Sequence, residues 1–286
     1  MKKIILFIIT YLLLGTSISS AKEYLSKDPN YINRGSLWGK TSVSNFKKKE
    51  LNRHNYRIIK DPTGTSPFDI VESFSPRAGD CGSRNHGSGK KSGKEIKDGV
   101  NDCNSGRLRL ELSDNWDNRI KKTSVKKKSL ERWFGYYIFI PEDFSIDKLL
   151  NPYITQFYGY SKKQKGGHSP EFAASINRNR EIISSGSIIV DKEDLKGKWH
   201  KIEYHIKWST KEDGFIKIYH NGKLKSVREN FVTLRHDVIT VKYGTYSHRD
   251  NASLYPSGYQ FPSHTIYFAG VSISKTRDKL KVNKIK

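Results

Sequence analysis

The strongest constraint on the fold is the segment 199–208 (WHKIEYHIKW), in which apolar and polar side chains alternate without a break. A period of two over this length indicates a β-strand with one buried face. The dipeptides Asp213-Gly214 and Asn221-Gly222 follow it, and both favour tight turns between antiparallel strands. The segments 199–208, 215–220 and 223–228 are therefore predicted to be consecutive antiparallel strands.

The rest of the chain favours an all-β fold. No long amphipathic helix is evident, and only a short one is expected near 146–150. Many short strands separated by turn residues are typical of a sandwich or jelly roll. We expect a single jelly-roll β-sandwich domain over 67–275, an irregular lead-in at 22–66 with at most one strand, and a loosely held basic tail at 276–286. The other predicted strands are 68–75, 106–113, 132–140, 152–160, 171–177, 186–191, 237–248 and 264–274.

The N-terminus has the pattern of a signal peptide. Lys2 and Lys3 precede an apolar run at 4–14, and small residues follow at 19–21. The apolar run has 11 residues, whereas a membrane-spanning helix needs about 20. We therefore expect cleavage after Ala21, a secreted or periplasmic protein, and no membrane attachment of the mature chain.

The two cysteines, Cys81 and Cys103, flank a Gly/Ser/Lys-rich insertion. An even cysteine count in an exported chain indicates a disulfide. The alternative is a metal site that also uses His86, but the spacing matches no standard zinc motif. We expect no metal or other cofactor, apart from a structural calcium as a weaker possibility. The insertion residues with oxygen ligands for calcium are Asp98, Asn101 and Asp102.

The charge of the chain predicts the chemistry of its partner. The formal net charge is +23 at pH 7, and such a surface attracts polyanions of any kind. Export makes an anionic polysaccharide the natural partner. A nucleic acid would satisfy the same charge, but none of the usual nucleic-acid-binding patterns is visible. We expect a monomer that binds acidic polysaccharide and no nucleic acid.

Three predicted strands, 106–113, 152–160 and 237–248, carry polar side chains on one face and core residues on the other. An exposed outer surface with cross-strand ion pairs would produce the same pattern in 106–113. A plain bulge would explain Gly244, although glycine inside a strand also marks the close approach of a ligand or another backbone. The residues placed on the polar faces are Arg107, Arg109, Glu111, Gln156, Tyr158, Lys242, Gly244, Tyr246 and His248.

In sequence order, the segments 109–112 (RLEL), 156–158 (QFY) and 242–246 (KYGTY) resemble the signature of polysaccharide lyases of the alginate-lyase and glucuronan-lyase type. The segments 77–81 (RAGDC) and 197–200 (GKWH) resemble the glucuronan-lyase side of the same group. The likeness covers about 68–274. It implies a heparin-lyase-like, concanavalin-like jelly roll that cleaves a uronic-acid-containing polysaccharide by β-elimination.

The resemblance also implies roles for individual residues. Tyr246 would transfer the proton, while Gln156 and Arg109 would hold the uronate carboxylate. Tyr158 stands where the family usually has His, so His168 or His248 would have to supply any imidazole. A lectin-like binder without catalysis is the alternative. The resemblance predicts substrate contacts for Arg107, Glu111, Tyr158, Lys242 and His248.

Overall fold

The computed structural model describes residues 34–38, 56–76, 107–114, 119–145, 151–161, 168–248 and 262–284; for 34–38, 107–109, 113–114, His168 and His248 it describes the backbone only. The predicted signal peptide, the Cys81–Cys103 disulfide, the calcium candidates (Asp98, Asn101 and Asp102) and the short helix at 146–150 lie outside these residues.

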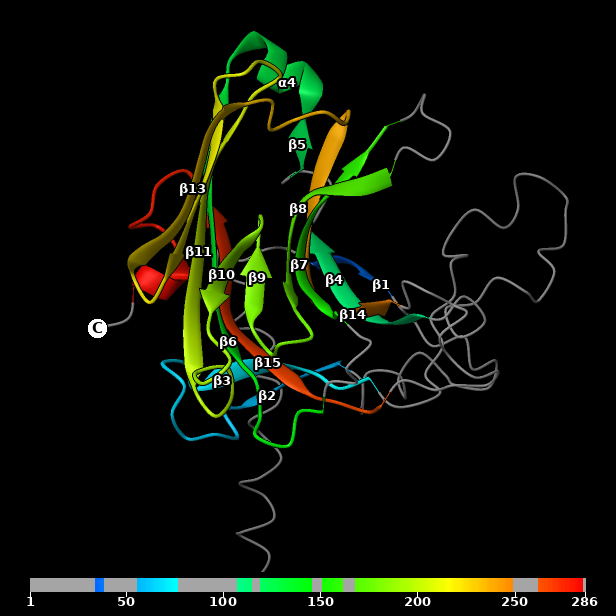
Figure 1. Cartoon of the computed structure of the whole chain (residues 1–286), viewed down its shortest axis with the longest axis vertical. Helices are drawn as coiled ribbons and strands as arrows, with labels where there is room; N and C mark the ends of the chain where they lie inside the picture. Colours follow the sequence, from blue (N-terminus) through cyan, green and yellow to red (C-terminus); the bar gives the residue numbers. More distant parts are fainter. Residues whose placement is uncertain are drawn as a thin grey trace, which may run out of the picture.

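Two antiparallel sheets face each other as the layers of a β-sandwich (Figure 1). In sheet A the strand order is β13 (Lys223–Phe231), β12 (Gly214–His220), β11 (Trp199–Trp208), β6 (Leu130–Phe139), β15 (Ile266–Ser274), β3 (Ile70–Phe74) and β2 (Tyr56–Lys60). In sheet B it is β1 (Arg34–Trp38), β4 (Arg107–Asp114), β14 (Val238–His248), β7 (Tyr153–Tyr160), β8 (His168–Ile176), β9 (Ile182–Ser184) and β10 (Ser187–Val190), with β5 (Ile120–Lys121) also paired to β14. The predicted all-β jelly-roll class is confirmed.

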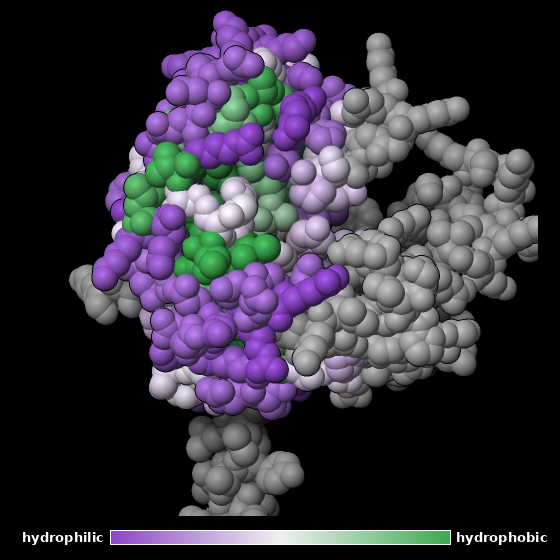
Figure 2. Space-filling model, viewed as in Figure 1, coloured by the Kyte–Doolittle hydropathy of each residue, from purple (hydrophilic) through white to green (hydrophobic). Residues whose placement is uncertain are grey.

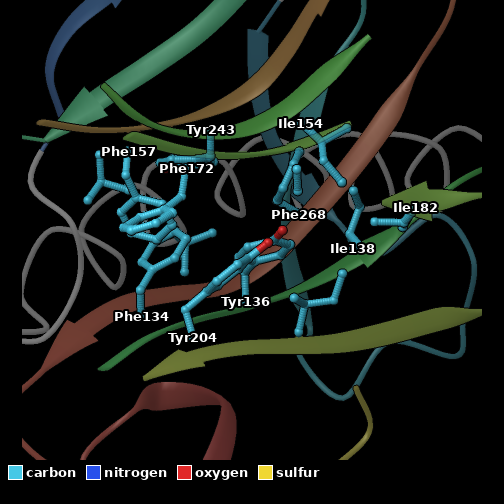
Figure 3. Close-up of a cluster of buried hydrophobic side chains, with 14 of the residues drawn as sticks. Phe134, Tyr136, Ile138, Ile154, Phe157, Phe172, Ile182, Tyr204, Tyr243 and Phe268 are labelled. Carbon is cyan, nitrogen blue, oxygen red and sulfur yellow. The ribbon is translucent and has the colours of Figure 1, made fainter. Parts of the chain in front are cut away.

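The core lies between the sheets and is rich in aromatic side chains. Figure 3 shows Phe157 and Tyr243 of sheet B pointing toward Phe134, Tyr136 and Tyr204 of sheet A. The rings of Phe134 and Phe157 meet edge to face at 5.6 Å, a favoured aromatic geometry. Each such side chain contributes about 1.5–3 kcal/mol through burial. The burial of these aromatic side chains therefore contributes much of the free energy that holds the two sheets together.

The alternating segment 199–208 forms β11. It pairs antiparallel with β6 on one side and with β12, the next strand in the sequence, on the other. The predicted turn at Asn221-Gly222 is present, with positive φ angles of 48° and 83°. Both residue types adopt this conformation readily, which is why the dipeptide was an informative signal.

The N-terminal part of the sandwich differs from the expected irregular lead-in. Two strands, β1 and β2, fall within 22–66, and each is an edge strand of one sheet. β2 pairs with β3 over Tyr56–Lys60. The sandwich therefore starts before residue 67. A short edge strand pairs with another strand on one side only and has few residues. Its alternation of apolar and polar side chains is therefore hard to detect in the sequence. The short helix α4 (Lys122–Lys127) was likewise not predicted.

The expectation of a loosely held C-terminal tail was wrong. Leu280 and Val282 are buried, and a Cβ at Gly135 would lie only 3.0 Å from the Leu280 Cδ1 atom. Arg277 donates two hydrogen bonds to the Glu203 carboxylate, at 3.0 and 2.8 Å. The segment through the 3-10 turn η3 (Lys281–Asn283) thus packs on the outer face of sheet A. Two apolar residues among many charged ones did not produce a recognisable period.

The surface is mainly hydrophilic, with hydrophobic residues exposed in places on the face that Figure 2 shows. Among the described residues, the large hydrophobic side chains that are exposed are Ile188, Leu224 and Val227. Within the same part of the chain, no helix has the length and apolar character that crossing a membrane would require.

Candidate active site

The three motif-bearing strands are neighbours near the middle of sheet B, in the order β4, β14, β7. Lys242 is the register partner of Gln156 in β7. On the other side of β14, Gly244 pairs with Glu111 and Tyr246 pairs with Arg109. Segments far apart in the sequence therefore bring the predicted residues to one short stretch of a single sheet.

These residues lie on the face of sheet B that points away from the sandwich core. Val241 and Tyr243 belong to the core, so the intervening Lys242 points to the opposite side. Phe157 likewise faces the core and leaves Gln156 on the outer face. We call this surface the outer face of sheet B. The core alternation predicted from the sequence is correct for all three strands.

Glu111 and Gln156 form a buried pair on this face. The Gln156 amide nitrogen donates a hydrogen bond of 2.5 Å to a Glu111 carboxylate oxygen. The exposed fractions are only 1% for Glu111 and 2% for Gln156. A carboxylate accepts hydrogen bonds only, so it fixes which end of the amide faces it. Glu111 therefore orients Gln156, and the amide nitrogen retains a second hydrogen for donation.

Lys242 is a buried cation bordered by tyrosine rings. Its exposed fraction is 3%, and its ammonium group lies 3.6 Å from the ring centre of Tyr158 and 5.7 Å from that of Tyr160. Such cation–π contacts strengthen where water is excluded. The Tyr158 ring thus supports the Lys242 ammonium. Tyr160 was not predicted, although its even spacing from Gln156 and Tyr158 was a signal for it.

Tyr246 stands at the border of this buried group and is itself half-buried. Its ring lies 5.9 Å from that of Tyr153, at a point where the β14–β7 register shifts. Gly244 precedes the shift with a φ of 135°, and a Cβ there would lie 2.3 Å from the Leu110 carbonyl oxygen. The neighbouring backbone therefore requires glycine here, which is the close approach of another backbone that the sequence offered as one explanation. The register shift between Tyr243 and Tyr246 pairs Tyr246 with Tyr153.

Four predicted residues are placed by their backbone alone. Arg109 pairs with Tyr246, and Arg107 pairs with His248. His168 pairs with Tyr160 in the β7–β8 ladder. Their roles stay predictions that rest on the register.

One half-buried histidine near the site was not predicted from the sequence. His264 lies 2.8 Å from the Thr245 hydroxyl and 3.1 Å from the Pro262 carbonyl oxygen. Burial lowers the pKa of His264 from 6.5 to about 4, although the hydrogen bond to Pro262 acts in the opposite direction. Its imidazole is therefore neutral at pH 7, and it supports the strand beside Tyr246.

The described residues contain no cluster of three or more His, Cys, Asp or Glu side chains arranged to hold a metal ion.

Comparisons with known proteins identify the family of this chain. Residues 35–272 match the family model described as polysaccharide lyase. An endo-β-1,4-glucuronan lyase from the fungus Trichoderma reesei is 15% identical, with 87% of this chain and 98% of that chain covered and a TM-score of 0.54. An alginate lyase, vAL-1 from Chlorella virus, is 14% identical, with 89% and 97% covered and a TM-score of 0.46.

No curated protein matches the sequence. At 15% identity, the likeness to the glucuronan lyase shows a shared fold alone. The family model extends over nearly all the strands of both sheets, and these include the strands that carry the polar residues of the outer face. The match over most of the chain shows that this protein belongs to the polysaccharide lyase family.

Proposed function

We propose that the protein cleaves a uronic-acid-containing anionic polysaccharide by β-elimination on the outer face of sheet B. The observation that carries the proposal is the buried pairing of Gln156 with Glu111 next to the buried cation Lys242. In a member of the polysaccharide lyase family, these groups have the chemistry needed to hold a sugar carboxylate.

The reaction explains why these groups are useful. A lyase removes the proton on carbon 5 of the uronate, beside the carboxylate, and expels the oxygen on carbon 4. The carbon acid is weak while the carboxylate is fully charged, so donors must stabilise the negative charge that develops. The second hydrogen of the Gln156 amide and the Lys242 ammonium would act on that carboxylate, and Arg109 would add a two-pronged contact.

Tyr246 is the proposed acid–base group. A tyrosine can take a proton when nearby cations stabilise its phenolate form. Lys242 lies four residues before Tyr246 in β14, and Arg109 is the register partner of Tyr246. The half-buried position of Tyr246 gives it access to a chain bound along the sheet. The Tyr246 phenolate oxygen would take the proton from carbon 5, and the hydroxyl formed in this way would donate it to the departing sugar oxygen.

The charge and the N-terminus support an extracellular polyanion as substrate. The net charge of +23 draws acidic chains toward the protein, and the signal peptide proposed at 1–21 would export it. Arg107, Tyr158 and His248 are proposed to contact neighbouring sugars along the chain. We propose that the Cys81–Cys103 disulfide forms after export.

Elimination creates an unsaturated sugar end that absorbs ultraviolet light, and this signal tests the proposal. The purified protein would be incubated with alginate, glucuronan and glycosaminoglycans, and absorbance followed over time. We expect growth with at least one polymer and its loss in Tyr246→Phe. Tyr219→Phe, a half-buried tyrosine of sheet A, is the matched control. Binding of a polymer without any absorbance growth would contradict the lyase proposal and favour a lectin-like binder.

A further inference from the structure

A second cluster of reactive side chains lies at one end of the β7–β8 ladder. His236 precedes β14, and its Nδ1 atom lies 2.8 Å from a carboxylate oxygen of Glu171. Its other ring nitrogen, Nε2, lies 3.4 Å from the hydroxyl oxygen of Ser169. Hydroxyl, imidazole and carboxylate are thus connected in series.

The Glu171 carboxylate determines which nitrogen of the His236 imidazole carries the hydrogen. One of its oxygens also accepts the backbone N–H groups of Arg235 and His236, at 2.6 and 3.1 Å. The other accepts the Arg235 side-chain Nε–H at 3.0 Å. A carboxylate held in this way accepts only, so Nδ1 must donate to it. In neutral His236 the Nε2 atom is then an acceptor, directed at the Ser169 hydroxyl.

The backbone around the cluster is shaped to seat the imidazole. A Cβ at Gly159, the register partner of Ser169, would lie 2.2 Å from the His236 Nδ1 atom. The β7–β8 register shifts between Phe157 and Tyr158, which leaves Glu171 as the extra residue of a bulge. Bulges redirect side chains and are frequent beside active sites.

The exposure of the three groups also fits a nucleophile. Glu171 and His236 are buried, whereas Ser169 is exposed. Anchoring of the backbone at Arg235 and His236 accounts for the Glu171 contacts, but it does not require an acceptor nitrogen aimed at an exposed hydroxyl. An activated serine requires both a base in reach and a group that orients the base.

We propose that Ser169, His236 and Glu171 form a hydrolytic triad that cleaves acyl esters. The Ser169 oxygen attacks the acyl carbon while His236 Nε2 takes its proton. The imidazolium, stabilised by Glu171, then gives this proton to the alcohol oxygen as the ester bond breaks. Water attacks the resulting acyl-serine and passes a proton to His236, which returns it to the Ser169 oxygen and releases a carboxylic acid.

The surroundings indicate an ester on an anionic carrier. The Arg235 side chain is 66% exposed although its Nε atom contacts Glu171, and the Lys122 ammonium donates to the Arg235 carbonyl oxygen at 2.8 Å. Two cations therefore lie beside the segment that carries His236 and the carboxylate that it contacts. An acylated acidic polysaccharide fits this charge, so the substrate class is an acyl ester of a sugar hydroxyl on such a polymer.

The first test uses p-nitrophenyl acetate as the ester and a fluorophosphonate as the covalent probe. We expect the wild-type protein to hydrolyse the ester and to be labelled on Ser169, as located by peptide mass spectrometry. Ser169→Ala should lose the label and lower kcat/KM by about 10³-fold or more. Ser187→Ala is the matched control, because that hydroxyl bonds only to Ser226 among the described residues.

A second variant separates catalysis from folding. Glu171→Gln keeps an oxygen for the two backbone N–H groups but removes the charge that stabilises the imidazolium. We expect its ester hydrolysis to fall while its melting temperature changes little, and we expect polysaccharide lyase activity to persist in Ser169→Ala. Equal ester hydrolysis by wild type and Ser169→Ala, or labelling at another residue, would overturn the proposal.

Discussion

The two sheets each bury a carboxylate on their outer face, but they use it differently. Glu203 of sheet A is contacted by Arg277 through both of its oxygens and also accepts a 2.7 Å hydrogen bond from Asn283. Glu111 of sheet B, in β4, accepts a hydrogen bond of 2.5 Å from the Gln156 amide nitrogen. Gln156 lies in β7, and β14 separates the two strands. One carboxylate fastens the C-terminal segment, and the other orients a side chain.

The hydrogen-bond partners of Glu203 and Glu111 show that the two carboxylates have different roles. Arg277 and Asn283 come from the segment that covers the outer face of sheet A, so their bonds to Glu203 hold that cover in place. Gln156 and its register partner Lys242 both belong to strands of sheet B itself. A buried polar network inside one sheet costs folding free energy unless all its groups are hydrogen-bonded. Substrate binding is a reason for the protein to keep such polar side chains at these positions. The predictions below test this distinction.

The largest expected effect is on proton transfer. Tyr246→Phe keeps the ring beside Tyr153 and removes only the hydroxyl, so polymer binding should persist while elimination falls by roughly 10²–10⁴-fold. Absorbance assays for turnover and calorimetry for binding would separate the two. Full elimination activity in this variant would show that Tyr246 is not the acid–base group.

Gln156→Ala should reduce both binding and elimination, by about 10–100-fold in kcat/KM, because a donor to the sugar carboxylate is lost. The matched change on the other sheet is Asn283→Ala, which removes a hydrogen bond to Glu203. Steady-state kinetics should show little change for the sheet A variant. Similar kinetic losses in both variants would mean that the two networks do not differ in function.

Arg277→Ala should act on stability instead. It leaves the buried Glu203 without its guanidinium partner, and we expect a loss of about 2–3 kcal/mol in the free energy of unfolding. Urea denaturation would measure it, and limited proteolysis should show easier cleavage of the C-terminal segment. Elimination activity well below the unfolding temperature should be retained; if it disappears while the fold persists, the outer face of sheet A contributes to the reaction.

A smaller effect concerns acid stability. Burial lowers the pKa of His264 to about 4, so below its ordinary value of 6.5 the unfolded chain binds a proton that the folded chain does not. This histidine therefore has little effect on stability at pH values above 6.5 and progressively opposes the fold as the pH falls toward 4. The loss should be on the order of 1–2 kcal/mol near pH 5. Chemical denaturation across pH should show a shallower acid slope for His264→Gln than for wild type.

Much of the sandwich was predictable because its central strands alternate strictly. The segment 199–208 and its following turns gave correct strands and correct buried faces. The C-terminal segment was not predictable in the same way, because Leu280 and Val282 are isolated among charged residues. Their burial depends on the small size of Gly135 in a distant strand, which no local pattern reports.

The candidate site was predictable in part. Alternation identified the polar faces of three strands, and their adjacency in sheet B brought Gln156 beside Lys242. The ring of Tyr158 below Lys242 could not be foreseen, because it depends on cross-strand geometry. The Ser169–His236 contact was also hidden, since it joins residues 67 positions apart through a bulge that leaves no sequence signature.

The most direct test of the account is a crystal structure of Tyr246→Phe with a uronate oligosaccharide that the wild-type protein cleaves. The account predicts a sugar chain along the outer face of sheet B, with one carboxylate in hydrogen-bonding distance of the Gln156 amide nitrogen and near the Lys242 ammonium. An oligosaccharide bound on sheet A, or on sheet B with its carboxylates turned away from Gln156 and Lys242, would contradict it.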